Sequence, residues 1–203
     1  PGQTTTSWLS DLETTIDLSP SHISAYCLTY EEDTDFFNKL TGGVFRQDNA
    51  LDAQLFELTM HRLQRAGFAH YEISNYAQSG AESLHNQAYW EGRLFLGFGP
   101  SAFSTLPNIR QQNISDTTEY IRRINANESV VSFSETLTES LRLKERIAFG
   151  LRMASGLPAT LLTPWQSEVQ TFLEEGLLES RGSNIALTPK GRLVADSIGE
   201  AFL

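Results

Sequence analysis

Apolar residues recur at helical spacing in several segments of the chain. Trp8, Leu12 and Ile16 follow one another at intervals of four and predict a helix over residues 7–18, with Ser7 as its N-cap. The same spacing predicts helices at residues 49–66, ending at Gly67, and at 136–154. A last helix is predicted from Thr188-Pro189, with Leu193, Val194 and Ile198 inward, and two more are expected at 116–126 and in a stretch that ends near residue 178.

Two segments carry the apolar and β-branched composition of strands. Residues 22–30 predict a buried strand, and residues 69–74 predict a shorter one after the helix at 49–66. Helix, strand, helix and strand in this order predict a layered βα sheet, in which ligands bind at the carboxyl ends of strands. Thr29 would lie at one such end and Ser74 at another.

The second half of the chain has the pattern of a separate unit. A polar segment at residues 107–115 predicts a linker between a first domain at 1–106 and a second at 116–203. Residues 178–188 predict a hairpin that turns at Arg181-Gly182-Ser183-Asn184. Helices followed by a two-stranded wing and another helix give the outline of a winged-helix module, so we expect a mostly helical second domain.

Charge and composition exclude several classes of protein. The net charge is −10, and no lysine or arginine lies between Met153 and Glu179, which disfavours binding to nucleic acid. No apolar run approaches the about 20 residues that span a bilayer, and the N-terminus lacks a signal-peptide pattern. The single cysteine, Cys27, excludes an internal disulfide, and we expect it to be buried as a small apolar residue. These features predict a cytoplasmic protein. The missing initiator methionine suggests a piece of a longer chain.

The densest chemistry lies in residues 85–104. His85-Asn86-Gln87-Ala88-Tyr89-Trp90 places an imidazole, an amide, a phenol and an indole within six residues. His85 either contacts a ligand or packs and hydrogen-bonds Glu72 or a nearby carbonyl. Tyr89 and Trp90 either stack on a ligand or fill the core, and Asn86 either caps its turn or contacts a ligand.

A glycine-spaced segment follows this cluster, Leu96-Gly97-Phe98-Gly99-Pro100-Ser101-Ala102-Phe103. Glycine lacks a Cβ and adopts positive φ at low cost, so Gly97 and Gly99 could bring backbone close to a ligand. The simpler interpretation is a plain turn into a strand, because two glycines alone are a weak signal.

Several motifs together resemble the oxygen-independent coproporphyrinogen III oxidase-like radical SAM family. Tyr71-Glu72-Ile73-Ser74-Asn75-Tyr76-Ala77 matches its Y-E-I-S-N-[FY]-A signature, and Pro1-Gly2-Gln3-Thr4 resembles the end of its G-L-P-G-Q-T segment. The H-N-x-x-Y-W and L-G-x-G-x-S-A motifs match as well, and residues 141–157 resemble its C-terminal domain. The resemblance implies the C-terminal part of an open (β/α)6 partial TIM barrel, followed by a winged-helix-like domain.

The form of the histidine motif points to one branch of this family. H-N-x-x-Y-W is typical of HemW-like haem chaperones, whereas coproporphyrinogen dehydrogenases carry an H-R-N-F-x-G-Y-T-T sequence there. The resemblance therefore implies a protein that binds haem or a related tetrapyrrole and, at full length, delivers it to haem-accepting proteins. A homodimer of this protein is a further expected assembly. The alternative is the oxidase of haem biosynthesis, and whether the complete protein is an enzyme stays open.

The resemblance also assigns site residues and cofactors. It implies haem binding by His85, Asn86, Tyr89 and Trp90, with His85 as a candidate iron ligand. It also implies binding of S-adenosyl-L-methionine (SAM) by Thr29, Gly97, Gly99, Ser101 and Phe103. The family's [4Fe–4S] cluster needs a C-x-x-x-C-x-x-C motif, and Cys27 stands alone. We therefore expect the cluster loop and the first barrel strands to precede Pro1, and expect no radical chemistry from this chain alone.

A barrel without its first strands would expose the edge of the strand predicted at 22–30. Open edges pair with other chains unless something covers them. We predict that the 203-residue chain either self-associates through this edge or keeps only its C-terminal domain well folded. Hydrogen exchange should then find slow amides in 136–198 and fast amides in 22–30 of the dilute protein. A monodisperse monomer with equal protection in both regions would contradict the prediction.

Overall fold

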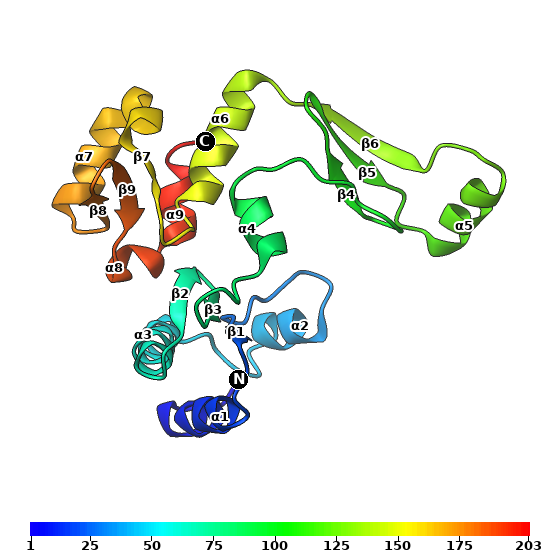
Figure 1. The fold of residues 1–203 in the computed structure, drawn as a ribbon. Coiled ribbons are helices and arrows are strands. Elements are labelled where there is room, and N and C mark those ends of the chain that lie inside the picture. Colours follow the sequence, from blue (N-terminus) through cyan, green and yellow to red (C-terminus); the bar gives the residue numbers. More distant parts are fainter.

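The computed structural model describes residues 1–203 as three parts, namely an N-terminal part, an arm and a C-terminal module (Figure 1). The parts meet around α4 (Leu84–Trp90) and α6 (Glu139–Gly150). Each part contains one three-stranded sheet, and all strand pairs are antiparallel. The chain is therefore mixed α/β, but the partial barrel implied by the family resemblance is not confirmed. None of its helices combines the length and apolarity needed to cross a membrane.

The N-terminal part packs α1 against α3, and α3 against a sheet of strand order β1-β3-β2. Helix α1 begins earlier than predicted because Thr4, not Ser7, is its N-cap. The two residues exchange hydrogen bonds in a capping box. The elements are α1 (Thr5–Asp17), β1 (His22–Ser24), α2 (Asp35–Thr41), α3 (Asn49–Arg65), β2 (Ala69–Glu72) and β3 (Asn75–Ala77). The buried core residues are Leu12, Ile23, Met60, Leu63, Phe68 and Tyr76.

The strand predicted at residues 22–30 is wrong beyond Ser24. Strand β1 ends there because its only partner, β3, is three residues long and supplies no further ladder. Residues 25–30 have no regular structure, and Cys27 is exposed rather than buried. The edge position of β1 agrees with the open edge expected at this segment, although its pairing with β3 is antiparallel.

The arm is an antiparallel meander that extends away from the other parts (Figure 1). Its central strand lies within the segment 107–115 that was predicted to be a linker. That strand reads Ile-Arg-Gln-Gln-Asn, and it is polar because both faces of the sheet remain partly open to solvent. The elements of the arm are β4 (Phe103–Thr105), β5 (Ile109–Asn113), α5 (Thr117–Asn125) and β6 (Val131–Thr136).

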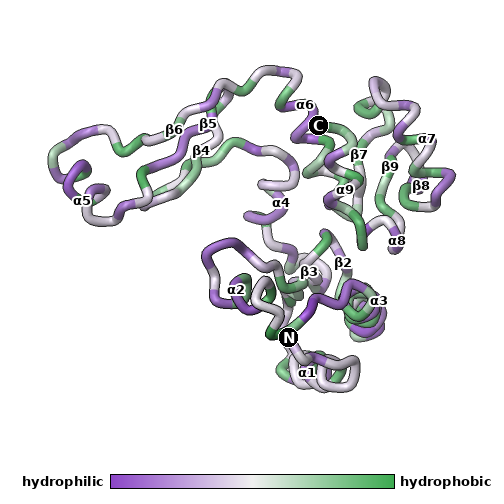
Figure 2. The backbone as a smooth tube through the Cα atoms, turned by 180° about the vertical axis from the view of Figure 1, so that it is seen from behind, coloured by the Kyte–Doolittle hydropathy of each residue, from purple (hydrophilic) through white to green (hydrophobic).

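The C-terminal module confirms the predicted hairpin. Strands β8 and β9 pair in register across a turn in which Gly182 has φ of 62°. A third strand, β7, pairs with β9, and the hydrophobic colour of β7 and β9 in Figure 2 marks the strands that face the core. The elements are α6, β7 (Leu157–Pro158), the 3-10 helix η1 (Ala159–Trp165), α7 (Gln166–Glu174), β8 (Leu178–Arg181), β9 (Asn184–Leu187), α8 (Pro189–Arg192) and α9 (Ala195–Glu200).

The last predicted helix is two short helices. Thr188 caps α8, as its sequence suggests, but α9 starts only at Ala195. The interruption changes the helical phase, so Val194 is exposed although it was predicted to point inward, while Ile198 is buried. The C-terminal module thus contains helices and a hairpin as predicted, but its assignment as a winged-helix domain is not confirmed.

A tight turn between β2 and β3 joins the N-terminal part to the C-terminal module. Ile73, in this turn, belongs to the C-terminal core of eleven buried residues. The amide of Ala154 donates to the carbonyl of Tyr71 at 2.9 Å, and Glu72 and Met153 form an isolated antiparallel bridge. Apolar burial and backbone hydrogen bonds therefore dock the two parts together.

His70 completes this junction as a neutral imidazole. Its Nε2 donates to the carbonyl of Ile73 at 2.8 Å, which leaves Nδ1 to accept from Arg192 at 2.6 Å. The ring stacks on Tyr76 with centroids 4.2 Å apart. Burial, together with the positive charge of Arg192, lowers the pKa of His70 from 6.5 to about 4.

This lowered pKa predicts that acid destabilises the junction. Between pH 6.5 and about 4 the unfolded chain binds a proton at His70 that the folded chain excludes. Folding stability should therefore fall by up to about 3 kcal/mol as the pH drops through this window. Urea unfolding at a series of pH values should show this slope in the wild type and not in His70→Gln. The matched control is His61→Ala, at an exposed histidine, which should keep the slope; a wild-type slope in His70→Gln would contradict the prediction.

Candidate functional site

The histidine motif forms α4, a short helix held at its start by the N-terminal sheet. The hydroxyl of Ser83 caps the helix by accepting from the amide of Asn86 at 3.2 Å. The amide of Ser83 donates to the hydroxyl of Tyr71 at 3.3 Å, and Nε2 of His22 lies 2.9 Å from the same oxygen. Tyr71 therefore fixes where α4 leaves the sheet. Asn86 is the third residue of the helix, and Ser83 rather than Asn86 provides the cap.

His85 is exposed, and no hydrogen bond of its side chain is found in the structure. The carboxylate of Glu72, which was considered as its partner, instead accepts from the amide of Ser74 at 3.1 Å and from the side chain of Asn75. The imidazole stands edge-on to the ring of Tyr89, four residues later, with centroids 4.7 Å apart. Both ring nitrogens of His85 are free to meet a ligand.

Trp90 lies on the opposite side of this cluster and packs toward α6. Its ring meets Phe149 edge-on at 6.2 Å, and the guanidinium of Arg152 lies 4.7 Å from the ring centroid. The indole N–H is buried without a partner. Trp90 therefore joins α4 to α6, while His85 and Tyr89 remain partly open to solvent.

The glycine-spaced segment runs from α4 into β4 and is held by its own neighbours. A Cβ on Gly97 would collide with the carbonyl of Phe103, so this glycine lets two stretches of backbone approach each other. Gly99 has φ of 100°; its amide donates to the hydroxyl of Tyr120 at 3.2 Å. Ser101 has φ of 60°. The conformation of the segment is thus explained within the chain, and its proposed role toward SAM stays a prediction.

Thr29 lies apart from that segment. It is exposed in the stretch between β1 and α2, whereas Phe103 begins β4 on the arm (Figure 1). Within the chain, no group of three or more His, Cys, Asp and Glu side chains could hold a metal ion. The residues present do not fit a [4Fe–4S] cluster, because Cys27 is the only thiol.

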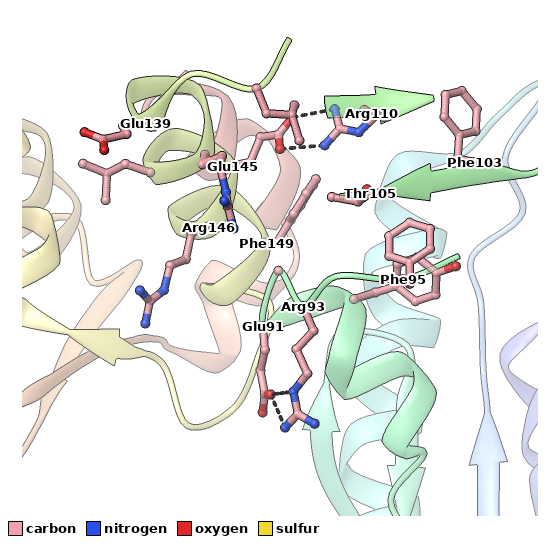
Figure 3. Close-up of a pocket in the computed structure, with 15 residues that line it drawn as sticks. Glu91, Arg93, Phe95, Phe103, Thr105, Arg110, Glu139, Glu145, Arg146 and Phe149 are labelled. Atoms are coloured by element: carbon pink, nitrogen blue, oxygen red, sulfur yellow. Dashed lines mark hydrogen bonds and ion pairs between the residues drawn. The ribbon is translucent and has the colours of Figure 1, made fainter. Parts of the chain in front are cut away.

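Two of the predicted site residues, Tyr89 and Phe103, line the same cavity (Figure 3). This cavity lies between α4, the first strands of the arm and α6. Phe95, Arg93 and Phe149 also line it, and sequence reasoning missed them because they come from separate segments. The sequence held one usable signal, because Phe149 lies off the apolar side of its predicted helix. In the structure its side chain is 38% exposed.

An ion pair closes the cavity on the side of the arm. Arg110 of β5 donates two hydrogen bonds to Glu145 of α6, at 2.8 and 2.7 Å, and a third to Glu135 at 3.3 Å. These bonds, with burial opposing them, raise the pKa of Arg110. The bidentate pair fixes the arm against α6 and so sets the width of the cavity.

Comparison with known proteins gives concordant findings. Residues 137–194 match the HemN C-terminal domain family. The whole chain aligns with "Heme chaperone HemW" of Mycobacterium tuberculosis strain H37Rv at 30% identity and of Bacillus subtilis strain 168 at 28%, covering 53% and 56% of those proteins. It is 29% identical to "Radical S-adenosyl methionine domain-containing protein 1, mitochondrial" of Mus musculus, with 98% of the chain and 50% of the relative aligned.

A solved structure has the same fold. Coproporphyrinogen III oxidase (HemN) from Escherichia coli, described as a radical SAM enzyme, superposes with a TM-score of 0.75 at 18% identity. The superposition covers 100% of this chain and 52% of the oxidase chain. The chain thus spans about half the length of the relatives it matches.

The close approach at Gly97 predicts a loss of stability on adding one methyl group. Gly97→Ala should lower the free energy of unfolding by about 1 to 3 kcal/mol, because the new Cβ meets the backbone of Phe103. The control is Gly199→Ala, where the nearest atom would be Ala148 Cβ at 3.5 Å. That variant should match the wild type or gain up to about 1 kcal/mol. Equal denaturation midpoints for wild type and Gly97→Ala would refute the packing explanation.

Proposed function

We propose that this chain serves haem binding and transfer, because it belongs to the oxygen-independent coproporphyrinogen III oxidase-like family. Within that family it corresponds to the C-terminal part of the HemW haem chaperones. In the complete protein, haem would be accepted at α4 and delivered to haem proteins. The coproporphyrinogen oxidase alternative is supported by the HemN C-terminal domain match and by likeness to a structure at 18% identity, whereas the whole-chain relatives named as haem chaperones reach 28 to 30%.

The free imidazole of His85 is the observation that carries this proposal. The chain has four histidines, and two of them are engaged: His22 contacts the hydroxyl of Tyr71, and both nitrogens of His70 have partners. His61 and His85 are exposed, but only His85 stands against an aromatic ring that lines a cavity. Imidazole is a common axial ligand of haem iron, so His85 is the candidate ligand.

The neighbouring residues of α4 would support the bound haem. Tyr89 offers a ring that is 39% exposed, suited to contact an apolar macrocycle. Asn86, one residue after His85, would lie within reach of a propionate, and Trp90 would hold the helix against α6.

SAM and an iron–sulfur cluster belong to the complete protein of this family. The cluster would have to be bound by residues other than those of this chain. We propose that SAM binding in the complete protein involves Thr29, Gly97, Gly99, Ser101 and Phe103, as the resemblance of their motifs to the family implies. No step of haem binding at α4 needs either group.

A haem titration tests the proposal. Absorbance in the Soret region should shift on binding to the wild-type chain, because a nitrogen ligand changes the electronic state of the iron. His85→Ala should lose this shift and bind haem at least about tenfold more weakly, since one ligand bond is lost. His61→Ala, which removes the other exposed histidine, should behave as the wild type. Identical spectra and affinities in wild type and His85→Ala would remove His85 from the site.

A further inference from the structure

The cavity beside α4 has the size of a small-molecule site. Its volume is about 580 Å³, within the range usual for ligand pockets. Residues of three elements or their flanks line it: the end of α4, the strands β4 and β5 of the arm, and α6. The bidentate pair of Arg110 and Glu145 links the arm to α6 at one end of the cavity, so the cavity is already formed in the chain without a ligand.

Aromatic rings line two sides of this cavity. Phe149 projects from α6, and Phe95 and Phe103 lie across from it on the side of the arm (Figure 3). Tyr89 extends the second wall, with its ring centroid 4.6 Å from that of Phe95. Phe149, Tyr89 and Phe103 are 38%, 39% and 41% exposed, an unusual gathering of open aromatic surface around one hollow. Such walls suit a flat, conjugated ligand that stacks between them.

The charge of the lining differs from that of the chain. Four arginines and three glutamates give the cavity one net positive charge, in a chain with a net charge of −10. Arg110 is committed to two glutamates, but two other arginines are available. Arg93 pairs with Glu91, two residues away, in an exposed ion pair of the kind that contributes little. Arg146 takes part in no ion pair or side-chain hydrogen bond.

We propose that this cavity binds the tetrapyrrole itself, with Phe149 and Phe95 holding the macrocycle and Arg93 and Arg146 binding its carboxylates. A flat apolar ring with two carboxylate groups matches both the aromatic walls and the spare positive charges. The identity of the ligand rests on the proposed function. Tyr89 connects the two sites, because it contacts His85 on one side and lines the cavity on the other.

A metal-free porphyrin separates this proposal from iron ligation by His85. Protoporphyrin IX carries the flat ring and two carboxylates but no iron, so its binding should depend on the cavity alone. Titration followed by porphyrin fluorescence should show Phe149→Ala weakened about tenfold and Arg93→Gln/Arg146→Gln weakened about tenfold. His85→Ala should leave this affinity unchanged. Phe149→Leu, which keeps apolar volume, guards against a folding defect and should give an intermediate loss.

Matched controls lie outside the cavity. Phe133→Ala removes a ring that is 47% exposed on the same sheet, and Arg65→Gln removes an exposed cation of α3; both should bind as the wild type. The dimethyl ester of protoporphyrin IX lacks the carboxylates. It should bind the wild type as weakly as the acid binds the double arginine variant, and it should not respond to that variant.

The outcomes distinguish the two proposals. Equal protoporphyrin affinity in wild type, Phe149→Ala and the double arginine variant would overturn the cavity assignment, while a Soret shift that depends on His85 would leave the proposed function standing. Displacement of bound porphyrin by S-adenosylhomocysteine at equal concentration would also overturn it, by assigning the aromatic walls to an adenosine. Porphyrin binding that follows the predicted variants, without any effect of His85 on haem, would support the cavity and refute the iron ligand.

Discussion

The docking of the β2–β3 turn into the C-terminal module is the constraint on which the other contacts depend. Ile73 fills a place in a core otherwise built from residues beyond 146, and the backbone of Tyr71 bonds that of Ala154. The same short segment also fixes α4, because the hydroxyl of Tyr71 accepts from Ser83. This segment therefore positions both the start of α4 and the end of α6, and together with the Arg110–Glu145 pair it sets the distance across the cavity.

Each of the three parts is too small to account for its own folded structure in isolation. The N-terminal core has six buried apolar residues, and each sheet has only three short strands, which is near the minimum for independent stability. Phe56, which is partly buried, packs against both cores, and Ile73 of the N-terminal part is buried in the C-terminal core. The arm has no core cluster of its own. It is bonded to α6 by the bidentate pair of Arg110 and Glu145 and by Arg142, which donates to the carbonyl of Pro107 at 2.6 Å. Cooperative folding would then follow from the junctions.

A common physical theme links the exposed histidine and the open aromatic rings. A folded chain ordinarily engages its imidazoles and buries its phenylalanines, as it does for His70 and Phe202. Around α4, by contrast, the imidazole of His85 has no partner and the ring of Phe149 is partly exposed. The neighbouring Arg93 has only an exposed ion pair with Glu91, two residues away in sequence. Groups left unsatisfied in this way are available to a ligand that brings its own apolar face and negative charge. That availability is the shared basis of the two proposals made for this region.

The sequence by itself determined what depends on neighbours along the chain. Helical spacing located α3 and the middle of the helix predicted at 136–154, which is α6, while α5 lies where a short helix was predicted. The glycine turn located the β8–β9 hairpin, because these elements are stabilised by residues close in sequence. The H-N-x-x-Y-W and Y-E-I-S-N-Y-A motifs also marked the family and His85. Tertiary structure alone decided that β1 stops at Ser24, that the polar segment at 109–113 is the middle of a sheet, and that Phe149 faces Phe95 across a cavity. These features depend on partners distant in sequence, whose hydrogen bonds and contacts no local pattern records.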